Sequence, residues 1–153
     1  MNSIDSFLNE KLGINIVPTK LYHLTPAKNI EKIKKEGLKP TASKSSLLGI
    51  FLSDNKFTAQ NYASMYRDDN EFFVLVINGS LLNVNKIVPD NYEFPDLLSQ
   101  MTDKEQQKYD LNSWSDSLKV CNQIAYTGII SPNMITKYEK YENWINNCLK
   151  INT

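Results

Sequence analysis

Residues 49–54 read Gly49-Ile50-Phe51-Leu52-Ser53-Asp54, a short apolar run that ends in residues able to cap a helix. Upstream, Lys20-Leu21-Tyr22-His23-Leu24 is a second such run, and it holds the single histidine of the chain. Both runs have the length and the residue types of β-strands. A helical pattern follows the 49–54 run and reaches Tyr62. The sequence therefore predicts two strands and a helix that carry one imidazole and the aromatic rings of Phe51 and Tyr62.

The wider pattern predicts an α+β fold, because short helices and strands follow one another without regular βαβ units. The run 71–77 is apolar on both faces and predicts a strand inside a sheet. No repeat or linker divides the 153 residues, so a single domain over 1–153 is expected. The other expected elements are a helix over 6–12, a helix that Thr25 caps and Gly37 ends, a helix after 53 that Ser53 or Asp54 caps, strands over 81–84 and 120–126, and a final amphipathic helix holding Tyr138, Tyr141, Trp144, Ile145 and Leu149.

Composition excludes several classes of protein. Basic and acidic residues balance at 17 each, which argues against a strongly basic nucleic-acid surface. No run approaches the roughly 20 apolar residues of a membrane helix, and no secretory signal is recognised, so we expect a cytoplasmic protein without a membrane partner. Cys121 and Cys148 have no Cys or His at metal-ligand spacing, so no metal site is expected. The sole arginine, Arg67, is either a solvated residue or a phosphate ligand.

Residues 85–119 have the composition of a long excursion over a pocket, with two Pro-containing turns and a capped helical start at Thr102. The usual signatures of hydrolases, kinases and metalloproteases are absent from the sequence. Four aromatic residues in the excursion could stack on an acceptor molecule or pack locally, and the pattern leaves both readings open. These residues are Tyr92, Phe94, Tyr109 and Trp114.

The segment from Leu21 to about Ile135 resembles the ADP-ribosyltransferase superfamily. His23-Leu24-Thr25 matches the H-x-T phrase of the first strand, which the bacterial DNA-modifying transferases and the RNA 2′-phosphotransferases share. The run 49–54 matches the G-[IV]-[YF]-[FL]-[AS]-D strand of the poly(ADP-ribose) polymerase branch. The resemblance implies a central split antiparallel sheet flanked by short helices, with NAD as the substrate.

The resemblance also implies roles for particular residues. His23 would bind the adenosine ribose of NAD, and the backbone of Leu24 would hold the nicotinamide carboxamide. Phe51 and Tyr62 would sandwich the nicotinamide ring. The implied NAD-binding residues are His23, Leu24, Thr25, Gly49, Phe51, Ser53, Thr58 and Tyr62, and the implied catalytic residues are His23, Phe51 and Gln123.

Two positions depart from the family pattern. Ala59 stands where many members of the polymerase branch have a serine for the carboxamide, so that hydrogen bond is lost or passes to Ser53 or Thr58. Alignment on the segment 128–132 brings Gln123 to or next to the usual catalytic glutamate. An amide can bond a ribose hydroxyl but offers no full negative charge to the developing cation, so slow turnover is expected unless another carboxylate helps.

The resemblance therefore implies a mono-ADP-ribosyltransferase, a glycosyltransferase that cleaves the nicotinamide–ribose bond of NAD and passes ADP-ribose to a protein or nucleic-acid acceptor. A weakened NAD- or ADP-ribose-binding module and an RNA 2′-phosphotransferase-like enzyme are the alternatives. The phosphotransferase reading is weaker, because no arginine lies near His23 in the sequence. Transferases of this size often resemble toxin or phage effectors, so an antitoxin or a host target is an expected partner.

Overall fold

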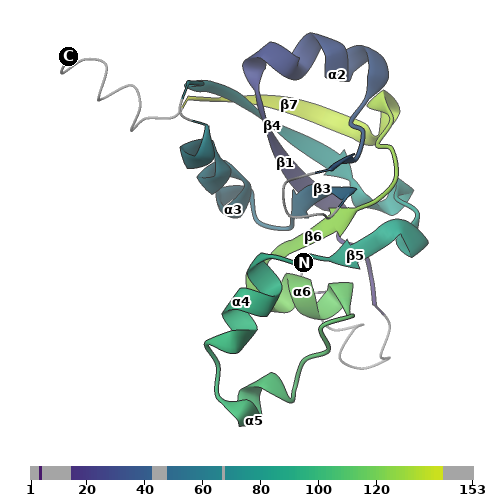
Figure 1. Ribbon diagram of the computed structural model, residues 1–153. Coiled ribbons are helices and arrows are strands. Elements are labelled where there is room, and N and C mark those ends of the chain that lie inside the picture. The colour runs from purple at the N-terminus through teal and green to yellow at the C-terminus, as the bar shows by residue number, and fades with distance from the viewer. Residues whose placement is uncertain (1–3, 5–14, 43–47, 67, 143–153) are drawn as a thin grey trace, which may run out of the picture.

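The computed structural model of the chain describes residues 4, 15–42, 48–66 and 68–142. Its strands form an antiparallel sheet in the order β5-β6-β3-β1-β4-β7, and β2 pairs with β3 beside this path. With the helices around it, the fold is α+β, as the sequence predicts (Figure 1). The strands are β1 (Lys20–Pro26), β2 (Thr41–Ala42), β3 (Leu48–Ser53), β4 (Glu71–Asn78), β5 (Ile87–Pro89), β6 (Gln123–Tyr126) and β7 (Ile135–Glu142). The helices are α2 (Ile30–Glu36), α3 (Lys56–Asn61), α4 (Glu93–Ser99), α5 (Asp103–Gln106) and α6 (Trp114–Cys121), with the 3-10 turns η1 (Ala27–Asn29), η2 (Tyr62–Met65), η3 (Gly79–Leu81), η4 (Val84–Lys86) and η5 (Pro132–Met134).

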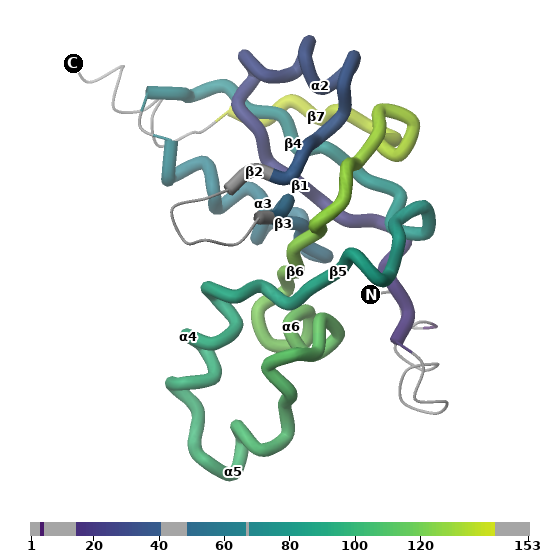
Figure 2. Tube along the Cα trace, turned by 45° about the vertical axis from the view of Figure 1, so that its right-hand side comes forward, coloured from purple at the N-terminus to yellow at the C-terminus, as the bar shows by residue number. Residues whose placement is uncertain are grey.

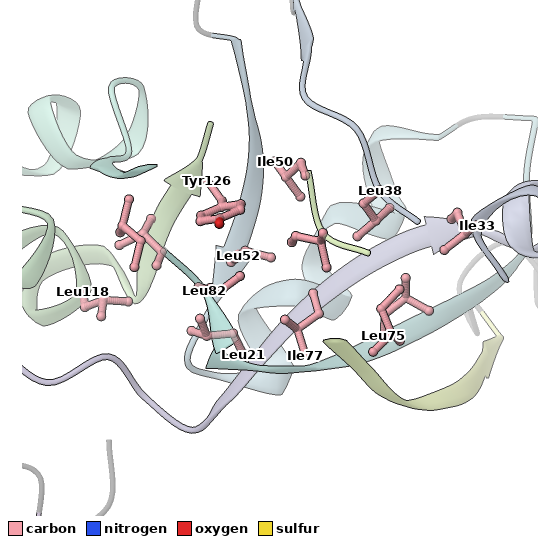
Figure 3. Packing of buried hydrophobic residues seen from close by; sticks show 14 of the residues in the cluster. Leu21, Ile33, Leu38, Ile50, Leu52, Leu75, Ile77, Leu82, Leu118 and Tyr126 are labelled. Carbon is pink, nitrogen blue, oxygen red and sulfur yellow. The ribbon is translucent and has the colours of Figure 1, made fainter. Parts of the chain in front are cut away.

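The main hydrophobic core lies on one face of the sheet, beneath α2. Leu21, Leu75 and Ile77 of β1 and β4 are fully buried there, and Ile33 of α2 packs onto the same cluster. Figure 3 shows these side chains joined to those of β3 and β6 in one continuous cluster. Burying an isoleucine or leucine stabilises a fold by roughly 1.5–3 kcal/mol. This cluster is therefore the largest source of stability for the strands that carry His23 and Phe51.

A second, smaller cluster covers the opposite face of β1 and β4. It contains Leu24, Phe72 and Val74 from the strands, and Ala63 from η2 packs against them. Ala59 and Ala63 are 3% and 2% exposed, and their small side chains let α3 and η2 lie close to the sheet. The two clusters together hold β1 and β4 from both faces, which explains why the apolar run 71–77 is correctly predicted as an inner strand.

Helices α4, α5 and α6 lie together at the end of the sheet formed by β5 and β6, away from α2 and β7 (Figures 1 and 2). Phe94, Leu98 and Cys121 form a third buried cluster between α4 and α6. The Thr102 side chain accepts from the Glu105 N–H and the Glu105 side chain accepts from the Thr102 N–H, so the predicted cap is confirmed. The excursion thus contains the strand β5 and three helices, with α5 at its far tip (Figures 1 and 2).

The C-terminal helix prediction is wrong for Tyr138 and Tyr141, which lie in β7. β7 pairs with β4 along its length, with Tyr138 opposite Leu75. Tyr138 packs against the main core and Tyr141 against the second cluster, so residues three apart serve opposite faces of a strand. That spacing imitates a helical stripe. The remaining positions, Trp144, Ile145 and Leu149, lie outside the described residues, as do the predicted helix over 6–12, Arg67 and Cys148.

Two other sequence-based predictions also need correction. The expected strand over 81–84 is instead a pair of 3-10 turns, because Asn78 and Asn83 accept from the N–H groups two residues further on. The expected strand over 120–126 begins only at Gln123, since α6 continues through Cys121. The strand that follows β4 in sequence is β5, and it pairs with β6.

The predicted helix caps also differ from the structure. Thr25 and Pro26 lie in β1, and no side chain caps the turn that follows. Asn55, rather than Ser53 or Asp54, caps α3 by accepting from two backbone N–H groups.

Gly37 ends α2 as predicted, with a positive φ of 75°. A Cβ at Gly37 would stand 2.1 Å from the Ile130 carbonyl oxygen, so this close approach requires glycine. Leu38 and Ile130 exchange backbone hydrogen bonds of 2.8 and 2.9 Å just beyond it. In the described part of the chain, no helix has the length and apolar character needed to cross a membrane.

Candidate functional site

The antiparallel sheet opens between β1 and β3. Within the described residues these strands pair at a single register position, Tyr22 with Ser53, whereas β1 pairs with β4 along its whole length. A small hollow of about 100 Å³ lies at this opening, and α3 and η2 contribute to its wall. Six of the predicted site residues line it: His23, Leu24, Phe51, Ser53, Tyr62 and Gln123. We call it the inner hollow.

His23 bridges the opening from β1 to β3. Its Nδ1 lies 2.8 Å from the Phe51 carbonyl oxygen, and because a carbonyl can only accept, Nδ1 carries the proton. Burial lowers the pKa of His23 from its usual value, although the bond to Phe51 acts in the opposite direction. The imidazole is therefore neutral at pH 7. Its Nε2 makes no hydrogen bond to the residues that the structure describes, so its lone pair can accept one from a ligand hydroxyl.

Phe51 and Tyr62 bring two aromatic rings to the inner hollow from different elements, β3 and η2. The Tyr62 hydroxyl donates a 2.6 Å hydrogen bond to Gln123 Oε1. Burial raises the pKa of Tyr62 to about 12, and the nearby Asp90 and Glu93 add to the rise against the lowering effect of Gln123. The hydroxyl is thus a firm donor that fixes the Gln123 amide.

Gln123 is 3% exposed and stands at the first position of β6. The preceding Asn122 has a positive φ of 61°, which turns the chain sharply from α6 into the strand. The Asn122 carbonyl accepts a 2.7 Å hydrogen bond from the Ser53 hydroxyl, and this bond connects the end of β3 to the start of β6. The Ser117 hydroxyl donates to the Gln123 carbonyl at 2.6 Å. Both ends of this short turn are thus held by buried hydroxyl groups.

The Ser53 side chain is used in hydrogen bonds to the backbone of the site. Its hydroxyl donates to the Asn122 carbonyl and accepts from the Asn55 N–H at 3.0 Å, and it is 2% exposed. Thr58, the other residue predicted to replace the carboxamide serine, lines a different hollow from Phe51. We therefore expect Ser53 to have a structural role, in which it connects β3 to the turn before β6, and not to bind the nicotinamide carboxamide.

A wider hollow of about 520 Å³ adjoins the inner one and shares His23, Leu24 and Phe51 with it. Thr25 and Gly49, the two predicted residues not yet placed, line this outer hollow. Lys32, Lys39 and Glu36 also line it, and each lysine lies 3.9 Å from a Glu36 oxygen. Two cations thus share one carboxylate, which leaves a net positive charge beside a space large enough for a nucleotide fragment.

A third hollow of about 320 Å³ lies on the other side of Tyr62 and Gln123, which line both it and the inner hollow. Thr58 lines it, as does Glu93 from the first turn of α4. We call it the side hollow. Every residue that the sequence analysis proposed for the site thus lines one of three adjoining spaces. Because Tyr62 and Gln123 are shared, the spaces form a row.

Sequence reasoning did not propose Tyr22, Tyr66 or Glu93 for the site. Tyr66 lines both the inner and the outer hollow, and its ring lies 5.6 Å from that of Phe72. The positions of the two tyrosines in the sequence could have indicated that they belong to the site. Tyr22 directly precedes His23, and Tyr66 follows Tyr62 by one helical turn. Glu93 had no local signal, because only the folded excursion brings it to Gln123.

Most aromatic residues of the excursion are packed in or against hydrophobic clusters of the protein and are not exposed to an acceptor. Phe94 is fully buried in the third cluster, and Tyr109 and Trp114 are partly buried against hydrophobic clusters. Tyr92 is 68% exposed and immediately precedes Glu93. Local packing therefore accounts for three of the four aromatic residues, and Tyr92 is the one that lies open to a partner.

No family model matches this sequence, and no curated protein matches it either. Across residues 15–42, 48–66 and 68–142, no group of three His, Cys, Asp or Glu side chains lies close enough to hold a metal ion. A functional assignment thus has to rest on the chemistry of the three hollows.

Proposed function

We propose that this protein is a mono-ADP-ribosyltransferase that breaks NAD between nicotinamide and ribose and passes ADP-ribose to a macromolecular acceptor. One observation carries the proposal: the sole histidine, the rings of Phe51 and Tyr62, and the amide of Gln123 line one hollow although they come from four separate elements. The family resemblance assigns these four residues to a single NAD pocket.

The protonation of His23 suits the proposed task. Because Nδ1–H is engaged by the Phe51 carbonyl, Nε2 is left as an acceptor for a hydroxyl of the adenosine ribose. The low pKa of the imidazole keeps it an acceptor at neutral pH. A protonated ring would instead have to donate, so the proposal requires the neutral form.

The inner hollow suits a flat aromatic group. Phe51 and Tyr62 offer ring faces for stacking with the nicotinamide, an arrangement worth about 1 kcal/mol beyond burial alone for an aromatic pair. The outer hollow would then hold the adenosine half of NAD, with Lys32 and Lys39 next to the diphosphate. Lysine can pair with phosphate as a point charge, so no arginine is required there.

Gln123 would contact the ribose that bears nicotinamide. Its Oε1 is occupied by the Tyr62 hydroxyl, so its N–H groups would donate to a ribose hydroxyl. As the glycosidic bond breaks, the bonding electron pair leaves with nicotinamide and positive charge develops on the ribose. An amide stabilises that charge less than a carboxylate would, so we expect slow turnover.

The proposal is tested by measuring nicotinamide release from NAD, with and without cell extract as a source of acceptor. Wild-type protein is expected to release nicotinamide, and His23→Ala and Tyr62→Ala are expected to reduce release at least about tenfold. Lys104→Ala, an exposed change on α5, is the control for handling and purity. Thermal melts of each variant separate loss of the pocket from loss of the fold. Absence of both NAD binding and nicotinamide release in the wild type would overturn the proposal.

A second function is favoured by one observation: Gln123, which the resemblance assigns to or next to the catalytic glutamate, is a neutral amide already bonded to Tyr62. A module that binds NAD or ADP-ribose without turnover would have this arrangement. NAD that raises the melting temperature of the wild type without releasing nicotinamide would establish the binding module over the enzyme.

A further inference from the structure

The side hollow contains a carboxylate beside the amide that replaces the usual catalytic glutamate. Glu93 and Gln123 both line this space, together with Tyr62. Burial is the main cause that raises the pKa of Tyr62 and of the Cys121 thiol, and Glu93 adds a smaller rise to both, which places it near these two groups. The side hollow therefore meets the inner hollow at Gln123 and has an acidic group on its wall.

Hydrogen bonds connect the backbone of Glu93 to the backbone of Gln123. Asp90 is 1% exposed, and its Oδ1 accepts from the Glu93 N–H at 2.8 Å. The Asp90 N–H donates to the Ser117 hydroxyl at 3.0 Å, and that hydroxyl donates to the Gln123 carbonyl at 2.6 Å. One fully buried hydroxyl thus joins the segment that holds Glu93 to the strand that holds Gln123.

Gln123 also has donors to offer to a ligand in this space. It is 3% exposed, and its side-chain oxygen accepts from Tyr62. Its side-chain nitrogen makes no hydrogen bond to the part of the chain that the structure describes. Among the buried side-chain nitrogen and oxygen atoms of the described residues, Glu139 Oε2 alone lacks a hydrogen-bond partner, so the Gln123 nitrogen is open to solvent and can donate to a group that enters the hollow.

Among the described residues that line the side hollow, Glu93 is the one with a carboxyl side chain, a type of group that serves as a general base in enzymes. Burial raises the pKa of Cys121 to about 11 and that of Tyr62 to about 12, so both stay protonated. The other described residues around this hollow have no acidic or basic side chain: Thr58, Asn61, Ser64, Met65 and Gln123.

We infer that the side hollow is the acceptor subsite of the proposed transferase and that Glu93 is its general base. The inference rests on the proposed function. A lone pair of the acceptor atom bonds to the ribose carbon that loses nicotinamide, and the broken bond's electron pair leaves with nicotinamide. The proton of the acceptor passes to the Glu93 carboxylate and then to water. NAD and the acceptor are the only reactants.

The same geometry specifies the acceptor. A carboxylate on the wall repels acidic side chains and phosphates, so the acceptor is a group that carries a proton and must lose it. No lysine or arginine is among the described residues that line this hollow, which disfavours a nucleic-acid backbone. Met65, 72% exposed, lies on its wall, and Tyr92, 68% exposed, precedes Glu93. These exposed apolar groups favour a protein acceptor with a hydroxyl or N–H nucleophile.

The test compares Glu93→Gln with Asp96→Asn, an exposed change on the same helix. Binding of NAD is measured by calorimetry, and transfer is measured with labelled NAD and cell extract. Glu93→Gln is expected to bind NAD within about twofold of the wild type and to lose transfer by about 100-fold, the lower end of the range for general-base catalysis. Asp96→Asn is expected to match the wild type in both measurements, and melting curves confirm that both variants fold.

Several outcomes would overturn the inference. Wild-type rates of transfer by Glu93→Gln would remove Glu93 from the reaction while leaving the proposed function intact. Label on nucleic acid, or a label on protein that neutral hydroxylamine removes as it does an ester of a carboxylate, would overturn the acceptor assignment. A wild-type protein that binds NAD without releasing nicotinamide would instead overturn the proposed function, and the role of Glu93 with it.

Discussion

Replacing Tyr62 with phenylalanine removes one hydroxyl and keeps the ring. That hydroxyl donates to Gln123 Oε1 at 2.6 Å, so the change separates the hydrogen bond from the stacking surface. The ring still lines the inner hollow, and Gln123 keeps its bond from Ser117 through the backbone. Tyr62→Phe therefore tests whether this bond fixes the Gln123 amide.

The expected loss of stability follows from the surroundings of the bond. A hydrogen bond contributes about 0.5–1.5 kcal/mol net, and leaving a buried acceptor without a donor costs about 1–3 kcal/mol. Gln123 is 3% exposed, but the inner hollow of about 100 Å³ has room for a water molecule that can replace the donor. We therefore expect a loss of about 1 kcal/mol, which lowers the melting temperature of a domain of this size by about 2–4 °C.

The assay is urea denaturation followed by fluorescence or circular dichroism. The control is Tyr109→Phe, because its ring is partly buried against the cluster of Phe94, Leu98 and Cys121 and its hydroxyl makes no hydrogen bond to the described residues. We expect the control to stay within about 0.5 kcal/mol of the wild type. Equal stabilities of Tyr62→Phe and Tyr109→Phe would refute the reasoning.

The alkaline pH dependence tests the burial of the same hydroxyl, because burial is the main cause of the raised pKa of Tyr62. Folding raises the pKa of Tyr62 from 10.0 to about 12, so the folded state holds this proton more tightly than the unfolded state. The stabilisation is complete below pH 10 and is lost as the pH rises through 12. The difference in stability between wild type and Tyr62→Phe should therefore shrink over this interval, and a constant difference would contradict the burial of the Tyr62 hydroxyl.

Three further predictions concern the remaining parts of the site. NMR titration of His23, the sole histidine, should give a pKa below 6.5 because of its burial, and stability should fall as the pH drops from 6.5 through that value; a pKa at or above 6.5 would contradict the neutral acceptor. Gln123→Glu should raise nicotinamide release about tenfold or more, because a carboxylate stabilises the positive charge that develops on the ribose. An unchanged or lower rate would show that position 123 is not the catalytic position. Combined Lys32→Ala and Lys39→Ala should raise the KM for NAD about threefold to tenfold, with the largest effect at low salt, whereas Lys104→Ala should leave it unchanged.

The sequence alone predicted the parts of the site that rest on local pattern. The strand around His23 and the strand that carries Phe51 are short apolar runs with clear ends, and Ala59 marks the face of the helix that leads to Tyr62. The types and spacing of neighbouring residues are enough to indicate these elements, because each element depends on local propensity and on one apolar face. Their meeting at one hollow depends on strand order, which periodicity does not encode.

The failures of prediction have a shared physical origin. In β7, residues three apart pack on opposite faces of a strand because hydrophobic clusters lie on both sides of the sheet. Near η3 and η4, asparagine side chains compete with the strand ladder for backbone N–H groups. In each case a tertiary contact or a side-chain bond overrides a weak local preference.

The neutral residue at position 123 can be understood from the charges around it. Asp90 is buried and is linked to Gln123 through the Ser117 hydroxyl, and Glu93 stands at the side hollow. A glutamate at 123 would be a third carboxylate in this small region, and like charges in a buried site resist joint ionisation. Gln123→Glu is accordingly expected to lower the stability of the fold even where it speeds bond cleavage. An amide inside the site and a carboxylate at its side hollow would divide between two residues the tasks of holding the ribose and receiving the acceptor's proton.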